Sequence, residues 1–125
     1  MDPFVHELSI ASAIVEQVAG LGPDVAGRRI VAVTLRVGRL ASVHEDALRF
    51  SFDVVRRGTP LDGADLRIVD VPVRIWCPAC AAEVALPGIQ PFICPDCGTR
   101  SGDIRAGREL DLESIEFAAA EESPA

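Results

Sequence analysis

Two short cysteine pairs are the residues in this chain most able to do chemistry. Cys77-Pro-Ala-Cys80 and Cys94-Pro-Asp-Cys97 are separated by 13 residues. Each Cys-x-x-Cys turn brings two sulfur atoms to one point, and two such turns supply the tetrahedral thiolate set that Zn²⁺ accepts. Four protein ligands leave no open coordination position. The spacing therefore predicts a structural zinc site and not a catalytic one.

Other interpretations of the cysteines are weaker, but one stays open. Four thiolates also bind iron, and geometry alone does not separate the two metals, so a rubredoxin-like electron carrier is an alternative. Metal-free buried cysteines would not come as two close pairs. A thioredoxin-like redox site needs one such pair at the start of a helix. Gly98, directly after the second pair, suits the positive φ that a metal-binding turn often requires.

The two histidines of the chain, His6 and His44, each precede acidic residues: Glu7 follows the first, and Glu45 and Asp46 follow the second. In one interpretation the acids complement helix dipoles in first turns, and both histidines are ordinary surface groups. In the other, they form a nitrogen-rich site near the N-terminus. Imidazole and deprotonated backbone amides suit square-planar nickel or copper. The residues alone favour the first interpretation.

Hydrophobic periodicity predicts two helices that would position these residues. The first spans residues 6–20, so that His6 stands at its start, and the second begins at a capping box formed by Ser42 and Glu45. Glycine and proline at 58 and 60 end the second helix. The expected buried positions of the two helices are Leu8, Ala11, Ile14, Val15, Val18, Ala19, Ala47, Leu48, Phe50, Ser51, Phe52, Val54 and Val55.

Alternating apolar residues predict three strands, over residues 29–37, 64–75 and 109–117. A phase shift at Asp70 and Val71, beside Pro72, indicates a bulge or an edge position in the second strand. The resulting fold class is α+β, with two helices on a three-stranded sheet and an inserted zinc-ribbon-like tetracysteine domain. We expect residues 1–75 and 107–117 to form one domain, 76–106 the zinc-binding domain, and 118–125 a flexible tail.

Composition narrows the classes of function. The chain has 125 residues, a net charge of −7, 12 basic against 19 acidic residues, no Tyr and one Trp. Such a surface repels phosphate backbones, so we expect no nucleic-acid partner. No segment is typical of a signal peptide or a membrane span, which favours a cytoplasmic protein with reduced thiols and no membrane insertion. No nucleophile–base set and no phosphate-binding glycine loop is visible, so we expect no enzyme.

Four segments together carry a family resemblance. They are HELSIA at 6–11, VGRL at 37–40, ALRFSFDVVRRGTPLDGADLRI at 47–68 and the CPxC…CPxCG module at 77–98. They cover nearly the whole chain in order. The chain resembles the hydrogenase-maturation nickel metallochaperones of the HypA/HybF family. The resemblance implies a mixed three-stranded sheet with two helices and a zinc domain inserted before the last strand.

The resemblance also implies a function. Such proteins bind Ni²⁺ as cargo and, with the GTPase HypB, deliver it to the large-subunit precursor of a nickel–iron hydrogenase, in some organisms also serving urease. His6 is then the principal nickel ligand, with Glu7 adding a backbone nitrogen or tuning the site. His44, Glu45 and Asp46 are weaker candidates for a further ligand. We expect a monomer or homodimer. A zinc-ribbon protein-interaction or nucleic-acid-binding module is the alternative function.

The N-terminus departs from the family pattern. Family members usually begin Met-His-Glu, whereas here residues 1–4 precede Val5, His6 and Glu7. The terminal amine is thereby displaced from the histidine, and Pro3 has no amide proton to lose. We hypothesise that Val5 corresponds to a GTG start codon, which is read as Met when it initiates. N-terminal mass analysis of protein from the natural host tests this, and a mature terminus at Met1 rules it out.

Overall fold

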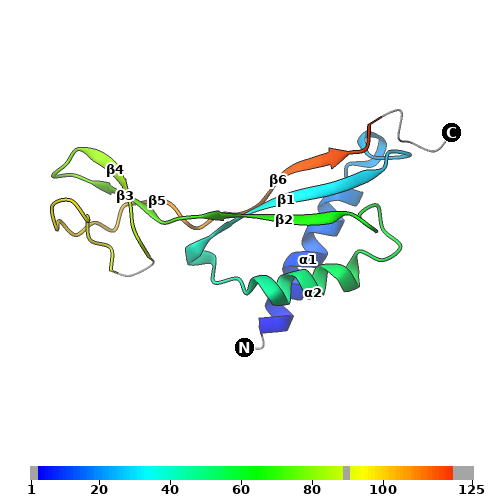
Figure 1. The fold of residues 1–125 in the computed structure, drawn as a ribbon, viewed down its shortest axis with the longest axis horizontal. Helices are drawn as coiled ribbons and strands as arrows, with labels where there is room; N and C mark the ends of the chain where they lie inside the picture. Colours follow the sequence, from blue (N-terminus) through cyan, green and yellow to red (C-terminus); the bar gives the residue numbers. More distant parts are fainter. Residues whose placement is uncertain (1–2, 89–90, 120–125) are drawn as a thin grey trace. The chain divides into compact units, whose positions relative to one another are not determined.

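The computed structural model describes residues 3–88 and 91–119, with side chains from residue 6 onward (Figure 1). Most of the expected tail therefore lies outside the described residues. The elements are α1 (Pro3–Ala19), β1 (Ile30–Gly38), α2 (Glu45–Val55), β2 (Asp65–Val71), β3 (Arg74–Cys77), β4 (Ala82–Ala85), β5 (Ile104–Ala106) and β6 (Leu110–Phe117), with short 3₁₀ turns at Gly22–Asp24 and Arg39–Ala41. None of the described helices is long and apolar enough to cross a membrane.

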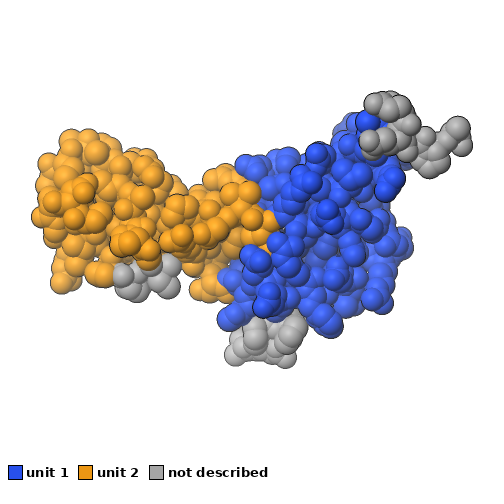
Figure 2. All heavy atoms as spheres, in the orientation of Figure 1, with its two compact units in different colours: residues 1–35, 43–67, 112–125 blue, residues 36–42, 68–111 orange. Residues whose placement is uncertain are grey.

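The chain forms two compact units (Figure 2). The first, called here the helical unit, consists of residues 1–35, 43–67 and 112–125. The second, called here the cysteine unit, consists of residues 36–42 and 68–111. Each candidate metal centre therefore lies within a single unit, His6 and His44 in the first and the four cysteines in the second.

In the helical unit, α1 packs against α2. Ala11, Ile14 and Val18 are fully or almost fully buried along one stripe of α1, and Leu48 and Phe52 are buried in α2. The assignment of Phe50 and Val54 in α2, and of Leu8 and Ala19 in α1, to the buried faces was wrong, since these side chains are exposed. Residue 50 lies two positions from both Leu48 and Phe52, about 200° around the helix, and therefore on the opposite face.

The predicted mixed three-stranded sheet is confirmed, with strand order β2-β1-β6 (Figure 1). β1 and β6 run antiparallel: the Gly38 amide donates to the Glu109 carbonyl at 2.7 Å, and the Ala118 amide to the Arg29 carbonyl at 2.9 Å. β2 lies at the edge of the sheet, as the phase shift near Pro72 indicated.

The prediction of one continuous strand over residues 64–75 was wrong. β2 ends at Val71, and β3, which begins at Arg74, belongs to a second sheet of order β4-β3-β5. Pro72 stands between them and has no N–H to donate, so it interrupts the ladder. In the second sheet β3 pairs antiparallel with β4, with Ile75 opposite Val84 and Cys77 opposite Ala82.

Both helix starts differ from the prediction. α1 begins at Pro3, because proline is well suited to a first helical position, so His6 and Glu7 lie inside the helix and Glu7 is not a first-turn acid. The capping box at Ser42 is not formed. His44 is the N-cap of α2, its own side chain makes no capping hydrogen bond, and Ser42 has a left-handed backbone with φ of 55°. Glu45 and Asp46 do lie in the first turn of α2, as expected.

The cysteine unit has its own small core. Val73, Ile75 and Leu86 are buried, and partly buried neighbours, Leu40, Val84, Phe92 and Ile104, pack against them. Two glycines let backbone segments approach closely beside this core. A Cβ on Gly38 would lie 2.0 Å from the carbonyl oxygen of Gly107, so no other residue fits at the end of β1.

Candidate metal centres

The four cysteines converge as the spacing predicts. All four Sγ atoms lie within 4.8 Å of one another, and among the described residues these form the only group of three or more potential metal-binding side chains. Cys77 Sγ is 3.5 Å from Cys97 Sγ, and Cys80 Sγ is 3.9 Å from Cys94 Sγ. A tetrahedron with Zn–S bonds of about 2.3 Å has S–S edges of about 3.8 Å. The cluster therefore has the dimensions of a four-thiolate metal site.

Backbone hydrogen bonds fix the two knuckles, the turns at residues 77–80 and 94–97. In the first, the Cys80 amide donates to Cys77 Sγ at 3.4 Å. In the second, the Gly98 amide donates to the Cys94 carbonyl and the Cys94 amide to the Thr99 carbonyl, both at 2.9 Å. Each knuckle contributes one buried cysteine, Cys77 or Cys94, and one exposed cysteine. The cluster thus has a protected side and a side open to solvent.

The residue after each knuckle takes a left-handed backbone. Gly98 has φ of 78°, as predicted for the second knuckle. The corresponding residue of the first knuckle is Ala81, with φ of 52°. A left-handed conformation costs a residue with a Cβ roughly 1–2 kcal/mol, whereas glycine adopts it freely. The first knuckle is therefore the more strained of the two.

Hydrogen bonds make the two exposed thiols unequal. Hydrogen bonding from the Thr99 hydroxyl, which lies 3.2 Å from the sulfur, and from the Thr99 amide lowers the pKa of Cys97 to about 6. Hydrogen bonding with Cys97 raises the pKa of Cys80 to about 12. At neutral pH Cys97 is thus a ready thiolate ligand, while Cys80 must lose its proton to bind a cation. Metal binding therefore releases protons and weakens as the pH falls.

The second candidate centre is built around a buried acid in α1. The carboxylate of Glu7 is fully buried, whereas the His6 side chain is 40% exposed. His6 Nδ1 lies 2.9 Å from Glu7 Oε1, and the backbone amide of His44 donates to Glu7 Oε2 at 3.1 Å. Glu7 thereby connects the imidazole of α1 to the N-cap of α2. It accepts the N-cap amide much as the acid of a capping box would, but from another helix.

This arrangement leaves His6 able to bind a metal. In the neutral imidazole, Nδ1–H donates to Glu7, and the lone pair remains on Nε2. Histidines that bind metals commonly donate their other ring N–H to a carboxylate in this way. The prediction that Glu7 belongs with His6 is consistent with this geometry, but its burial was not foreseen. The signal was present, because Glu7 continues the buried stripe of Ala11, Ile14 and Val18 at helical spacing.

The other three candidate nickel ligands do not gather around His6. The side chains of His44, Glu45 and Asp46 are exposed, and Glu45 lies 3.4 Å from Arg49. His44 contacts Glu7 through its backbone amide. Within residues 6–88 and 91–119, no cluster of three ligating side chains forms around His6. The structure thus places His6, Glu7 and the start of α2 in one neighbourhood without assembling a complete ligand cage there.

A match to a known family identifies the class of protein to which this chain, with its two candidate centres, belongs. The family model described as hydrogenase/urease nickel incorporation, metallochaperone, hypA matches residues 5–117. The chain belongs to the HypA family. HypA proteins are metallochaperones, so the chain is not an enzyme, as expected from the sequence.

Relatives and solved structures agree with the family. The chain is 48% identical over 112 residues to the hydrogenase maturation factor HypA of Chloroflexus aggregans, covering 90% of this chain and 98% of the relative. It is 41% identical to the HypA of Streptomyces avermitilis, covering 90% and 87%. The solution structure of the Ni metallochaperone HypA from Helicobacter pylori shares the fold, with a TM-score of 0.60, 20% identity and coverage of 90% and 97%. A second HypA solution structure gives a TM-score of 0.64 at 22% identity, covering 91% and 97%.

Proposed function

We propose that this chain takes up Ni²⁺ at His6 and delivers it, with the GTPase HypB as partner, to the large-subunit precursor of a nickel–iron hydrogenase in the cytoplasm. Urease maturation is a further destination. Support comes from membership of the HypA family, whose description names hydrogenase, urease and nickel incorporation. The close relatives are named as hydrogenase maturation factors.

The contact between Glu7 and His6 is the observation that carries the nickel assignment. The buried carboxylate holds Nδ1 at 2.9 Å, and Nε2 of this 40% exposed side chain keeps its lone pair for a cation. A single oriented imidazole at the surface captures a cation without enclosing it. Cargo has to leave again, so an incomplete ligand set suits a metallochaperone better than a closed one. His44, Glu45 and Asp46 at the start of α2 are the nearby candidates for a further ligand.

The helical start of α1 bears on backbone ligands. Within an α-helix the Glu7 amide donates to the carbonyl four residues earlier, so it is not free to bind nickel while α1 begins at Pro3. In a chain that starts at residue 5, the amides of His6 and Glu7 belong to the first turn, where amides have no acceptor within the helix. The shorter chain should therefore bind nickel more tightly, with deprotonated amides as ligands.

We further propose that Cys77, Cys80, Cys94 and Cys97 hold a resident Zn²⁺, that residues 76–106 form the zinc-binding domain, and that residues 1–75 and 107–117 form the nickel-binding domain. The S–S distances of 3.5 and 3.9 Å fit the metal. When bound, zinc supplies a cross-link between the two knuckles. The four sulfurs complete its coordination, so the site has a structural role. Metal analysis of purified protein distinguishes zinc from iron.

The nickel assignment is tested by titrating the zinc-loaded full chain with Ni²⁺. The His6→Ala variant should bind nickel at least about 100-fold more weakly, since it loses a ligand and not only an outer partner of one. The matched control is Gln17→Ala, which truncates an exposed polar side chain of the same helix. It should keep most of the affinity, and both variants should retain full zinc content. Unchanged nickel affinity in His6→Ala would overturn the assignment.

A further inference from the structure

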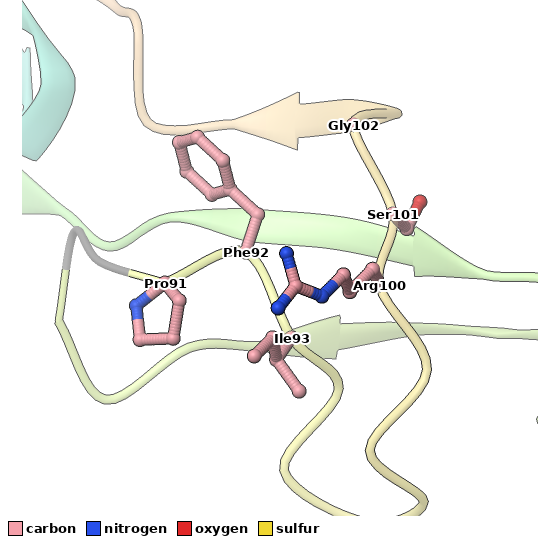
Figure 3. Close-up of a pocket in the computed structure, with 6 residues that line it drawn as sticks. All are labelled: Pro91, Phe92, Ile93, Arg100, Ser101 and Gly102. Atoms are coloured by element: carbon pink, nitrogen blue, oxygen red, sulfur yellow. The ribbon is translucent and has the colours of Figure 1, made fainter.

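A hollow on the cysteine unit is not used by either metal centre. It has a volume of about 400 Å³ and is lined by residues of the hairpin that carries the second knuckle: Pro91, Phe92, Ile93, Arg100, Ser101 and Gly102. Ile93 and Arg100 are partners in an antiparallel bridge, so their side chains leave the hairpin on the same face. Figure 3 shows the Arg100 side chain extending toward Ile93 and Pro91. One exposed guanidinium thus lies beside apolar side chains.

Arg100 differs from the other arginines of residues 74–88 and 91–106. Arg74 pairs with Glu83 at 2.7 Å, and Arg105 makes two bonds of 2.9 Å to Asp103. Within the described part of the chain, Arg100 has no carboxylate partner, although the protein carries 19 acidic residues. The described lining of the hollow contains no carboxylate either. The site therefore offers an unneutralised positive charge beside apolar walls.

The chemistry of the lining selects a carboxylate as ligand. A guanidinium donates two parallel hydrogen bonds to a carboxylate, and these charge-assisted bonds are stronger than neutral ones. The Ser101 hydroxyl accepts a bond from the Asp103 amide at 3.2 Å, which leaves its own hydrogen to donate. A free amino acid fits less well, since none of the described lining side chains is an acid that could accept its ammonium group. The site therefore favours a ligand whose amino group is part of an amide bond, as in a peptide.

A peptide offers two kinds of carboxylate, the side chain of an internal Glu and the C-terminus. The apolar wall beside Arg100 favours one of them. In an extended peptide, adjacent side chains point to opposite faces and those on one face stand two residues, about 6.8 Å, apart, so an internal Glu has no apolar group as close to its carboxylate. At a C-terminus the carboxylate and the last side chain share one Cα and enter together. The geometry points to a docking site for the C-terminal residue of a partner polypeptide, with an apolar last side chain against Pro91 and Ile93 and its carboxylate on Arg100. This inference does not depend on nickel transfer.

Peptide titrations of the ¹⁵N-labelled, zinc-loaded full chain test this site. The probes are acetyl-Ala-Ala-Leu with a free carboxylate, the same peptide as its amide, and acetyl-Ala-Glu-Leu amide. The free acid should shift the amide signals of Arg100, Ser101 and Gly102, and should bind about tenfold more tightly than either amide. Arg100→Gln should lose that tenfold preference. Arg57→Gln is the control, because it removes the same charge from an exposed residue of the helical unit.

Three results would overturn the inference. The first is equal binding of the acid and the amide, and the second is equal or tighter binding of the internal Glu peptide. The third is no binding by any probe at about 10 mM, a concentration that saturates a site with Kd of about 1 mM. The comparison of acid with amide uses the wild-type chain, so it decides the question even where Arg100→Gln fails to fold. Nickel titration of the same samples keeps this outcome separate from the proposed metallochaperone function.

Discussion

The two metal centres differ in how much of the coordination sphere the fold assembles in advance. In the cysteine unit four sulfur atoms lie within 4.8 Å of one another, and two of the cysteines are buried. Around His6 the fold prepares one imidazole and the buried acid that orients it, while His44, Glu45 and Asp46 remain at the surface. The first centre is close to complete before a metal arrives, whereas the second is not.

Under the proposed function, this difference separates a resident metal from a transferred one. A complete thiolate set contributes its binding energy to folding, with apparent values of about 10–16 kcal/mol for structural zinc in small peptides. An exposed imidazole with few prearranged neighbours makes no such contribution, so its metal can leave without disturbing the fold. The contrast gives three predictions, from the largest expected effect to the smallest.

The largest effect should come from Cys77→Ser, which removes a buried ligand. The variant should lose its zinc, and residues 74–106 should lose their order, because the core of Val73, Ile75 and Leu86 is small. The two helices should remain, since they pack on each other in the helical unit. Zinc analysis, amide exchange and the fluorescence of Trp76, the single tryptophan, measure the change.

The matched control for Cys77→Ser is Ala79→Ser, which places the same hydroxyl at an exposed position of the same knuckle that binds no metal. It should keep zinc and fold. A Cys77→Ser protein with an ordered cysteine unit and full zinc content would show that the cluster is not structural.

A smaller effect is expected from Glu7→Gln, which sharpens the account of the nickel site. His6 Nδ1 and the His44 amide bond to different oxygens of Glu7, and in Gln one of these positions becomes an NH2 group, which cannot accept, so one of the two bonds is lost. Nickel affinity should fall about 10–100-fold, as for other partners of metal-binding histidines. The free energy of unfolding should fall by about 1–3 kcal/mol. Nickel titration and denaturant unfolding measure the two effects.

Glu16→Gln is the control for the buried acid, because it removes an exposed carboxylate from the same helix. It should change neither the free energy of nickel binding nor that of unfolding by more than about 0.5 kcal/mol. If Glu7→Gln binds nickel as tightly as the wild type, the carboxylate does not orient the ligand and serves only to join the helices.

The smallest effect is expected within the cysteine unit, from Ala81→Gly. Glycine relieves the left-handed strain at φ of 52°, and the gain is offset in part by the greater freedom of the unfolded chain. The cysteine unit should become about 0.5–1 kcal/mol more stable. Ala79→Gly, in the same knuckle at a residue without positive φ, should destabilise it instead. Amide exchange of the zinc-loaded proteins measures the stability of the cysteine unit in both variants. Equal effects of Ala81→Gly and Ala79→Gly would contradict the assignment of strain to Ala81.

Local spacing was enough to predict the cysteine cluster. The geometry of a Cys-x-x-Cys turn depends only on its own residues. The positive φ of Gly98 is likewise a local property of the second turn. The two helices and the three strands of the main sheet also followed from hydrophobic periodicity. The family resemblance, which rested on four segments that include HELSIA and the cysteine module, is confirmed by the match over residues 5–117.

Features that depend on distant parts of the chain could not be predicted in this way. Glu7 meets the His44 amide across 37 residues, and only the packing of α1 on α2 brings them together. The expected capping box is not formed, because the N-cap is His44 and not Ser42, and Glu7 from the other helix accepts the His44 amide. The role of Gly38 is similar, since the carbonyl that excludes a Cβ there belongs to Gly107, far along the sequence.

The most direct test of the contrast between the two centres is a chelator challenge of the full chain loaded with both Zn²⁺ and Ni²⁺. The protein is mixed with excess EDTA at neutral pH, and both metals retained by the protein are followed over time by mass spectrometry. We predict that nickel leaves first and that zinc stays bound while the fold is unchanged. Release of both metals together, or of zinc before nickel, would contradict the assignment of a resident thiolate centre and a transferable metal at His6.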